Sequence, residues 1–270
     1  MKTGLITDVE RIEVVEVEKP RARPGWIVAE VKAAGICGTD IEIYTGEIPY
    51  LKTGKMRYPV VPGHEWTGVV VEVGEGVTKV QPGDRVISET HVGCGKCEDC
   101  VTGRYNLCQD MLRIGISGLP GGLAQYIHVP EKVVHRLPDV IPFDRGTLLE
   151  PASVSLYALN QVGFKGGERV VIMGPGTIGL LAISIAKALG ASWVTLVGTR
   201  DERLEVGRGL GADLVINVRR EPDTLKDLSG QVEVVLEATG SLEALVNSLG
   251  LVRSGGTLVI VSLFKGGIPG

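Results

Sequence analysis

The sequence predicts a two-domain α/β protein, in which a β-rich N-terminal domain precedes a doubly wound parallel sheet. Short apolar runs separated by Gly and Pro turns fill residues 1–150. From residue 151 onward, strand-like and helix-like segments alternate, which is typical of parallel strands joined by crossover helices. The chain has 270 residues, which is enough for two domains of ordinary size. We therefore predict domains over 1–150 and 151–270.

The predicted strands of the N-terminal half follow one another between tight turns. In residues 11–17, Ile and Val recur between Glu side chains, as in a strand with one buried face. Residues 69–73 are apolar at nearly every position, as in a strand buried on both faces. Two more strands are predicted at 26–31 and 85–87, each after a Pro-Gly turn. These short strands predict an irregular all-β domain, either a partial barrel or a sandwich.

In the second half, predicted helices and strands alternate. Pro151 suits the first turn of a helix over 152–162, and Gly190 and Gly211 are placed to end two later helices. Helices are also predicted from the glycine-rich turn to 189, over 202–210 and from about 241. The predicted strands are 169–173, 193–197, 214–217, 232–236 and 257–263.

Composition limits the class of protein. Hydrophobic residues make up 44% and charged residues 22%, which is typical of a globular protein with a core. A net charge of −4 argues against a general binder of nucleic acids or membrane surfaces. No apolar run approaches the roughly 20 residues of a membrane span, and the N-terminus lacks an apolar signal core. We expect a cytoplasmic protein with a small-molecule substrate.

Four of the five cysteines lie within fifteen residues, at Cys94, Cys97, Cys100 and Cys108. This spacing favours four thiolates on one structural zinc ion over a disulfide framework. A ferredoxin-type cluster would need a shorter last gap followed by Pro, so an iron–sulfur cluster is not expected. The segment also has no clear basic face, which disfavours a nucleic-acid-binding zinc module. We predict that the ion fixes a loop.

A glycine-rich turn between a predicted strand and a predicted helix indicates a dinucleotide site. Gly174 allows a tight turn, Gly176 lets the backbone approach a pyrophosphate, and Gly179 lets helix and strand pack closely. The N-terminus of the following helix supplies N–H groups and a positive dipole for the phosphates. The alternative is a glycine-rich turn that binds no ligand.

The end of the second strand of this domain indicates which cofactor binds. An NAD site usually presents Asp or Glu here to the ribose, whereas this chain has Gly198, Thr199 and Arg200. Gly leaves room for a 2′-phosphate, Thr can donate to it and Arg can pair with it, so the sequence favours NADP. NAD remains the alternative, in which Arg200 stacks on adenine and Asp201 or Glu202 binds the ribose.

A second group of metal-ligand residue types is spread along the N-terminal half. His64 and Glu65 stand side by side before a predicted strand, where a backbone can direct both at one cation. Such a pair alone is more often solvated or hydrogen-bonded. Here Cys37 precedes it and Glu150 follows it. Glu150 can also be explained as a carboxylate at a helix N-terminus.

With these features together, the chain resembles the zinc-dependent medium-chain dehydrogenase/reductases, in the branch of alcohol, sorbitol and threonine dehydrogenases. The resemblance spans essentially the whole chain, and it implies a GroES-like β domain followed by a Rossmann domain. The motifs that carry it are Gly63-His64-Glu65-x-x-Gly68, Cys37-Gly38-Thr39-Asp40, the four-cysteine segment, Gly83-Asp84-Arg85-Val86 and the glycine-rich turn.

The resemblance implies a catalytic zinc ion on Cys37 and His64, with Glu65 and Glu150 as direct or water-linked ligands. It also implies that Thr39 takes the proton of the alcohol into a relay. Thr39 could instead be an ordinary turn hydroxyl bonded to its own backbone. Further residues that the resemblance implies at the cofactor are Ile178, Arg203, Val261 and Leu263.

The implied function is a zinc-dependent oxidoreductase that transfers a hydride between a polyol or secondary alcohol and a nicotinamide cofactor, with NADP favoured over NAD. One alternative is L-threonine 3-dehydrogenase-type activity, and another is a truncated relative that binds a nucleotide without catalysis. Candidate residues of the substrate pocket are Tyr44, Tyr50 and Trp66, which do not identify the substrate.

The chain departs from the family pattern at its C-terminus, since relatives run well past residue 270. They continue with a sixth strand, which pairs across a dimer axis, and with a segment that returns to the catalytic domain. Full-length relatives are expected to be homo-oligomers. If the protein ends at residue 270, we expect an incomplete Rossmann domain, weakened dimerisation, low stability and little activity. The alternative, and the simpler explanation, is that the sequence is an incomplete record of the chain.

Overall fold

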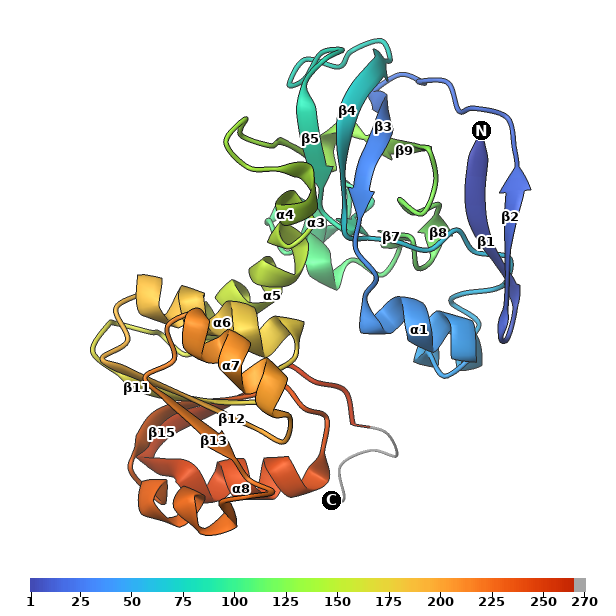
Figure 1. Ribbon diagram of the computed structural model, residues 1–270. Helices are drawn as coiled ribbons and strands as arrows, with labels where there is room; N and C mark the ends of the chain where they lie inside the picture. Colours follow the sequence, from blue (N-terminus) through green and yellow to red (C-terminus); the bar gives the residue numbers. More distant parts are fainter. Residues whose placement is uncertain (265–270) are drawn as a thin grey trace. The chain divides into compact units, whose positions relative to one another are not determined.

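The computed structural model describes residues 1–264, which form two compact units, Met1–Glu150 and Pro151 onward (Figure 1). The first unit is rich in strands and the second alternates strands with helices. The prediction of a β-rich domain followed by a doubly wound parallel sheet is confirmed.

The first unit contains three sheets. Five antiparallel strands in the order β10-β5-β4-β3-β9 form the main sheet, β1 and β2 form a hairpin, and β6, β7 and β8 form a small third sheet. The strands are β1 (Lys2–Asp8), β2 (Arg11–Glu16), β3 (Trp26–Ala34), β4 (Trp66–Val73), β5 (Arg85–Ser88), β6 (His91–Val92), β7 (Leu112–Ile114), β8 (Gly118–Leu119), β9 (Tyr126–Pro130) and β10 (Val134–Arg136). The helices are α1 (Gly38–Thr45), α2 (Pro49–Lys52), α3 (Glu98–Val101) and α4 (Phe143–Gly146), with the 3₁₀ helices η1 (Tyr105–Leu107) and η2 (Glu131–Val133).

The main sheet packs on a core that includes Trp66 at the start of β4. Its indole is fully buried and donates from Nε1 to Ser88 Oγ at 2.9 Å. The interpretation of Trp66 as a pocket residue is therefore wrong, because the ring is enclosed by the core. On the same strand, a Cβ at Gly68 would lie 2.3 Å from the Glu30 carbonyl oxygen, so only Gly allows β3 and β4 to pair so closely.

The second unit is a five-stranded parallel sheet in the order β13-β12-β11-β14-β15, which is a doubly wound topology. Its strands are β11 (Arg169–Met173), β12 (Trp193–Gly198), β13 (Leu214–Asn217), β14 (Val232–Glu237) and β15 (Val252–Ile260). Its helices are α5 (Leu149–Gln161), which begins at the end of the first unit, α6 (Thr177–Ala188), α7 (Asp201–Gly209) and α8 (Leu242–Leu251), with the 3₁₀ helix η3 (Pro222–Leu228).

The last strand differs from the predicted 257–263, since β15 begins at Val252 and ends at Ile260. The register between β14 and β15 shifts between the pairs Val232–Val252 and Val234–Thr257, and Gly255 within this stretch has φ +75°. A Cβ at Gly256 would lie 2.9 Å from the Glu233 carbonyl oxygen, so the glycine permits close pairing with β14.

Alternate strand residues of the second unit point to opposite faces of its sheet. Val170 and Ile172 of β11 pack with residues of α5, α6 and α7, whereas Val171 and Met173 pack with residues of η3 and α8. Figure 1 shows α6 and α7 on one face and α8 on the other. A sheet buried on both faces explains why these strands read as continuous apolar runs.

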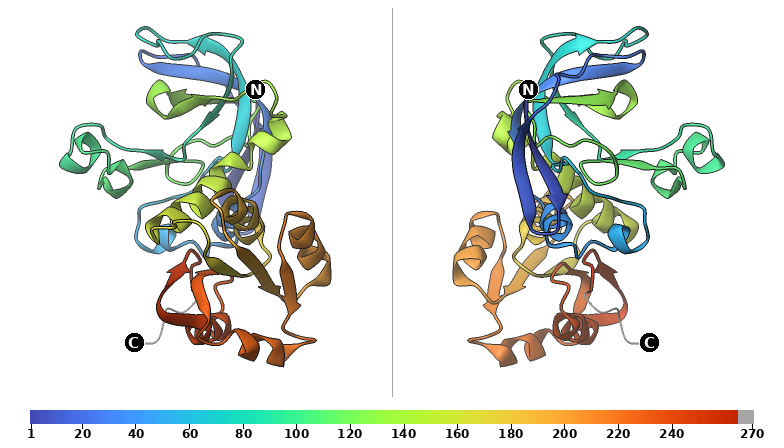
Figure 2. Two further views of the ribbon diagram at one scale, coloured as in Figure 1. Left: turned by 90° about the vertical axis from the view of Figure 1, so that its left-hand side faces the viewer. Right: turned by 90° about the vertical axis from the view of Figure 1, so that its right-hand side faces the viewer.

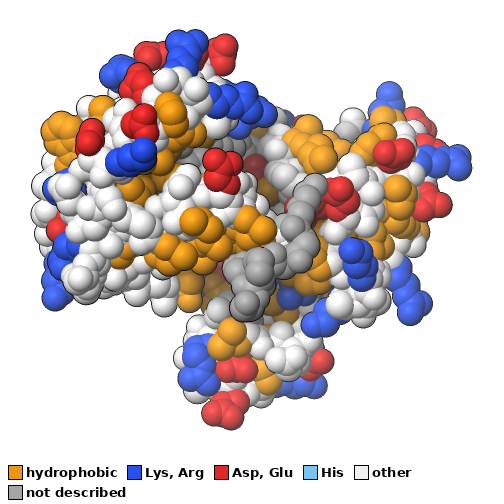
Figure 3. Space-filling view, turned by 90° about the horizontal axis from the view of Figure 1, so that it is seen from below, with side chains coloured by type: hydrophobic (Ala, Val, Ile, Leu, Met, Phe, Trp, Pro, Cys, Tyr) orange, Lys and Arg blue, Asp and Glu red, His pale blue; other side chains and the backbone are white. Residues whose placement is uncertain are grey.

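Charged side chains of both signs are intermingled on the face of the molecule drawn in Figure 3. Within residues 1–264, no helix is both long and apolar enough to cross a membrane.

Candidate metal centres and dinucleotide pocket

Three of the predicted metal ligands meet in the first unit. Ligand atoms of Cys37, His64 and Glu65 all lie within 4.8 Å of one another. Cys37 is the residue before α1, while His64 and Glu65 lie in the loop that leads into β4. His64 and Glu65 are almost fully buried. The thiol of Cys37 also contacts Thr39, with 3.8 Å between Sγ and Oγ1.

Asp40 connects the two loops that carry these ligands. Its buried carboxylate accepts a hydrogen bond from Cys37 N at 2.8 Å and another from Gly63 N at 3.0 Å. The same carboxylate lies 3.7 Å from Nδ1 of His64. The sequence analysis quoted Asp40 within a motif and gave it no role. The signal was its place three residues after Cys37, where a side chain can bond back to the start of a helix.

The electrostatics of this cluster favour a cation. Burial alone lowers the pKa of His64, but hydrogen bonding to Cys37 and the charges of Asp40 and Glu150 outweigh burial and raise the pKa to about 9. Burial raises the pKa of Glu65, against the lowering effect of His64. The cluster thus concentrates negative charge in a largely buried space, where a positive charge is stabilised.

Glu150 lies near this group, but its carboxylate is not within 4.8 Å of all three ligand atoms. Its charge acts on both His64 and Glu65, and its Oε1 accepts a hydrogen bond from Thr90 Oγ1 at 2.6 Å. Thr90 is itself buried, so the glutamate is held at the start of α5 by a fixed hydroxyl. The structure thus brings Cys37, His64 and Glu65 together and places Glu150 beside them.

The donor set suits a zinc ion. Thiolate, imidazole and carboxylate are the ligands that zinc takes in catalytic sites, and three protein ligands leave one position open. Nδ1 of His64 is buried without a hydrogen-bond partner, which is unusual for a polar atom. Glycine permits the crowding, since a Cβ at Gly35 would lie 2.3 Å from Oε2 of Glu65. These observations fit a metal centre.

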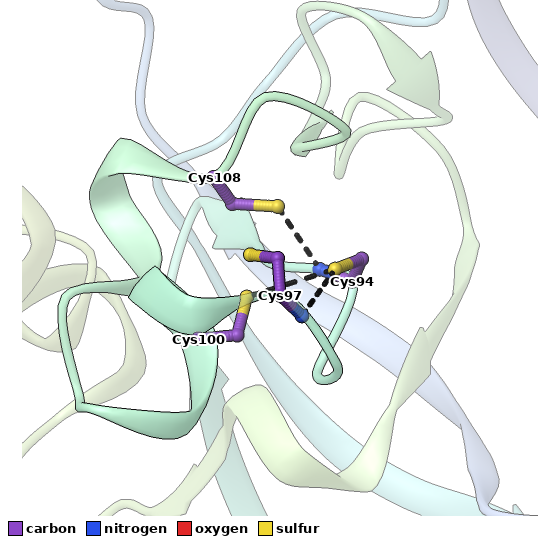
Figure 4. A group of neighbouring side chains, drawn as sticks. All are labelled: Cys94, Cys97, Cys100 and Cys108. Atoms are coloured by element: carbon purple, nitrogen blue, oxygen red, sulfur yellow. Dashed lines mark hydrogen bonds between the residues drawn. The ribbon is translucent and has the colours of Figure 1, made fainter.

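The second cluster contains the four remaining cysteines, all free thiols whose Sγ atoms lie within 4.8 Å of one another (Figure 4). Figure 2 shows this segment projecting from the first unit as a separate lobe, with α3 and η1 on it. Sγ of Cys94 accepts from Cys97 N at 3.4 Å, and Sγ of Cys108 accepts from Cys94 N at 3.4 Å. Backbone donors aimed at sulfur are typical of thiolate ligands.

Hydrogen bonds shift the pKa values of two of these thiols in opposite directions. Backbone N–H groups of Lys96 and Cys97 lower the pKa of Cys94 to about 6. At Cys97 a backbone hydrogen bond lowers the pKa, yet the neighbouring thiols outweigh it and raise the pKa to about 12. A divalent cation can replace the proton that Cys97 shares with its neighbours, so the four cysteines fit a closed zinc site.

The glycine-rich turn lies at the carboxyl end of β11, before α6. Gly174 has φ +109°, and a Cβ there would lie 2.8 Å from Cγ2 of Thr239. A Cβ at Gly179 would lie 2.0 Å from the Gly174 carbonyl oxygen, so Gly is required for the helix to pack on the turn. No atom lies within 4 Å of a Cβ built on Gly176, so the backbone is open to a ligand there.

A pocket of about 970 Å³ opens at this edge of the sheet. Gly174, Gly198 and Thr199 line it, as does Arg219, which the sequence analysis missed. Other lining residues absent from the predictions include Pro175, Val218, Lys226, Thr239, Glu243 and Asn247. The predicted cofactor residues outside this lining are Gly176, Ile178, Gly179, Arg200, Arg203, Val261 and Leu263. Arg219 follows β13. Because β12 and β13 are parallel neighbours, the residues after both strands lie at the same edge of the sheet, which was the signal for Arg219.

A polar network fixes the turn after β13. Nδ2 of Asn217 donates to Oδ1 of Asp201 at 2.6 Å, and Arg219 N donates to Oδ1 of Asn217 at 3.1 Å. Asp201 also forms an ion pair with Arg220. The carboxylate that could bind a ribose therefore already has an amide and a guanidinium as partners.

A buried carboxylate organises the other side of the pocket. Glu237 at the end of β14 is fully buried, and its Oε1 accepts from Thr239 N at 2.7 Å and Gly240 N at 3.2 Å. Oε1 also accepts from Thr239 Oγ1, and Oε2 accepts from Ser262 Oγ. This carboxylate thus holds Thr239 at the pocket and links the ends of β14 and β15.

Two family models match the chain. The alcohol dehydrogenase GroES-like domain matches residues 23–139, and the zinc-binding dehydrogenase model matches residues 177–269. Together they cover more than half of the sequence.

Individual proteins agree with this result. The chain is 35% identical to a sorbitol dehydrogenase of Bacillus subtilis over 97% of its own length and 75% of that protein. It is 38% identical to an L-threonine 3-dehydrogenase of Pyrococcus abyssi over 94% of its own length and 73% of that protein. Among solved structures, a candidate zinc-binding dehydrogenase of Sinorhizobium meliloti bound to NADP has a TM-score of 0.92 at 32% identity, covering 99% of this chain and 78% of that one.

Proposed function

The chain belongs to the zinc-dependent medium-chain dehydrogenase/reductase family, and from that premise we propose that it oxidises a polyol or another secondary alcohol with NADP. It is a zinc-dependent oxidoreductase of the alcohol and polyol dehydrogenase class, which uses a nicotinamide cofactor. The residue roles, the number of zinc ions and the preference for NADP are the parts that we propose.

The observation that carries the proposal is the convergence of Cys37, His64 and Glu65 within 4.8 Å. A zinc ion bound there acts as a Lewis acid, which favours ionisation of an alcohol near neutral pH. Cys37 and His64 would hold the ion, and Glu65 and Glu150 would be direct or water-linked ligands. Thr90 supports this role by fixing Glu150 through its hydroxyl.

Thr39 is the proposed first proton acceptor from the alcohol. Its Oγ1 lies 3.8 Å from Sγ of Cys37, in the first turn of α1, and the next residue is Asp40, which bonds the Gly63 backbone. A hydroxyl can accept one proton while it donates another, so it can pass the proton onward. The buried surroundings of His64 and Glu65 exclude water from the same region and strengthen every charge interaction in it.

NADP is the proposed cofactor because an arginine lines the pocket beside Gly198 and Thr199. This residue is Arg219; the second cation of the lining, Lys226, is paired with Asp223, and the nearby Asp201 is paired with Arg220. A free carboxylate would repel a 2′-phosphate, whereas a guanidinium group attracts it. The similar S. meliloti protein was solved with NADP.

We propose two zinc ions per chain, a catalytic ion on the Cys37 group and a structural ion on the four cysteines. The second ion would replace the hydrogen bonds between the Cys94 and Cys97 thiols with coordination. All five cysteines are free thiols, which fits the reducing cytoplasm as the proposed location.

The test combines metal analysis with turnover. Zinc is counted per chain by mass spectrometry, and absorbance at 340 nm is followed with NADP and with NAD on sorbitol, xylitol, butane-2,3-diol and L-threonine. We expect two zinc ions and faster reduction of NADP. The Cys37→Ser variant should retain one ion and lose turnover. One zinc ion in the wild-type protein and no turnover of any alcohol would favour a nucleotide-binding protein without catalysis.

A further inference from the structure

Thr90 lies between β5 of the main sheet and β6 of the small third sheet, and backbone hydrogen bonds fix this segment on both sides. Glu89 N donates to the Val133 carbonyl oxygen at 2.9 Å, and the Thr90 carbonyl oxygen accepts from Ile114 N at 3.0 Å. Thr90 is buried, and a β-branched side chain has few χ1 rotamers. The fold therefore gives the Thr90 hydroxyl a defined position.

This hydroxyl binds one oxygen of Glu150. Oγ1 of Thr90 donates to Oε1 of Glu150 at 2.6 Å, a distance typical of a hydroxyl that donates to an ionised carboxylate. Both residues belong to the first unit, although they are 60 positions apart in the sequence. The contact is therefore made by the tertiary structure and not by a local turn.

The two carboxylates near the Cys37 thiol have different partners. The Glu65 carboxylate forms a hydrogen bond with the thiol of Cys37, whereas Oε1 of Glu150 accepts from Thr90. Ligand atoms of Cys37, His64 and Glu65 all lie within 4.8 Å of one another, and Glu150 is not part of that set. One glutamate thus meets the thiol, while the other is bound to a fixed hydroxyl.

The two carboxylates are also close enough to affect each other. Burial raises the pKa of Glu65, the charge of His64 lowers it, and the charge of Glu150 raises it again. Like charges repel, so a second carboxylate at the same group has an electrostatic cost. A hydrogen bond donated by Thr90 to Glu150 offsets part of that cost and fixes the carboxylate where it lies.

We propose that Thr90 is a positioning residue, which holds the Glu150 carboxylate outside the set of direct metal ligands. Cys37, His64 and Glu65 would then bind the ion, and one coordination position would stay open for the alcohol. Glu150 would act on the group through its charge and through water. This inference rests on the proposed function, since it concerns the same metal group.

The test compares four variants with the wild type. Thr90→Val removes the hydroxyl and keeps the branched shape, Thr90→Ser keeps the hydroxyl, and Glu150→Gln is made alone and together with Thr90→Val. Thr3→Val is the control, because Thr3 is a buried residue of the same unit whose Oγ1 donates to the Leu123 carbonyl oxygen at 3.3 Å.

Three quantities are measured for each protein. Metal ions are counted per chain after dialysis against a chelator, and kcat and KM are measured on sorbitol and butane-2,3-diol. The absorption spectrum is recorded after substitution with cobalt(II), which binds the same ligand types as zinc and whose spectrum depends on its ligands. The four-cysteine site contributes equally to every spectrum and cancels in the differences.

Without the Thr90 hydroxyl, we expect the Glu150 carboxylate to compete for the open position. Thr90→Val should therefore keep two metal ions, change the cobalt spectrum and lower kcat/KM by about 10- to 100-fold, the effect of one hydrogen bond to a charged group. Adding Glu150→Gln to Thr90→Val should restore the cobalt spectrum. Glu150→Gln alone, Thr90→Ser and Thr3→Val should each keep the wild-type spectrum.

A changed cobalt spectrum in Glu150→Gln alone would overturn the inference, because Glu150 would then be a direct ligand in the wild type. A Thr90→Val variant that loses the ion of the Cys37 group, or that keeps the wild-type spectrum, would also overturn it. If Thr90→Val does not fold, the spectrum of Glu150→Gln decides. A wild type that binds two ions and oxidises no alcohol would contradict the proposed function, while the cobalt spectra would still decide the role of Thr90.

Discussion

Removing the carboxylate of Asp40 should release the proposed catalytic metal and destabilise the first unit. In Asp40→Ala, the backbone N–H groups of Cys37 and Gly63 lose their acceptor in a buried site. A buried donor without a partner costs about 1–3 kcal/mol, so two cost about 2–6 kcal/mol. That is a large part of the roughly 5–15 kcal/mol that stabilises a folded domain. The loops that carry Cys37 and His64 would also lose their link.

The free energy of unfolding is measured by urea denaturation, and zinc is counted per chain. We expect Asp40→Ala to lose at least about 2 kcal/mol and to retain only the zinc ion of the four cysteines. Asp139→Asn is the control, because the side chain of Asp139 is 95% exposed. A variant with wild-type stability and two zinc ions would show that Asp40 does not organise the site.

Four further predictions test other parts of the structure. Arg219→Gln should weaken binding of adenosine 2′,5′-bisphosphate more than that of AMP in calorimetry, because Arg219 lines the pocket; equal losses would contradict this. Glu237→Ala should weaken binding of both nucleotides and lower the denaturation midpoint, since it leaves Thr239 and Gly240 donors unpaired. Cys100→Ser should cost one zinc ion and leave the other, which metal analysis would detect, and loss of both ions would refute separate sites. Burial raises the pKa of Asp213, but Lys187 and a backbone N–H outweigh it and hold the pKa below its ordinary 3.8. The ionised Asp213 therefore stabilises the folded state above pH 3.8, and this stabilisation is lost as the pH falls through the lowered pKa. Asp213→Asn should flatten the pH dependence of unfolding in that acidic range, and an unchanged profile would exclude this pair as its source.

Local patterns in the sequence determined much of the architecture. The strands predicted at 169–173 and 214–217 coincide with β11 and β13, because a strand buried on both faces is an uninterrupted apolar run. The helix ends were also predictable, because Gly190 and Gly211, which follow α6 and α7, have the positive φ that favours glycine. Metal-ligand residue types at short spacing were also visible, since the four cysteines lie within one lobe.

Tertiary structure alone decided the residues that support the sites. The strands β6, β7 and β8 are two or three residues long, too short for a periodic signal, and Ile114 of β7 fixes Thr90 through a backbone hydrogen bond. Asp40 gains its partners only where the Gly63 loop meets the Cys37 loop, and Arg219 enters the pocket only through the alignment of β12 and β13. Periodicity and turn chemistry act within a few residues, whereas these contacts join segments that are distant along the chain. Their identity is therefore fixed by how the chain folds back on itself.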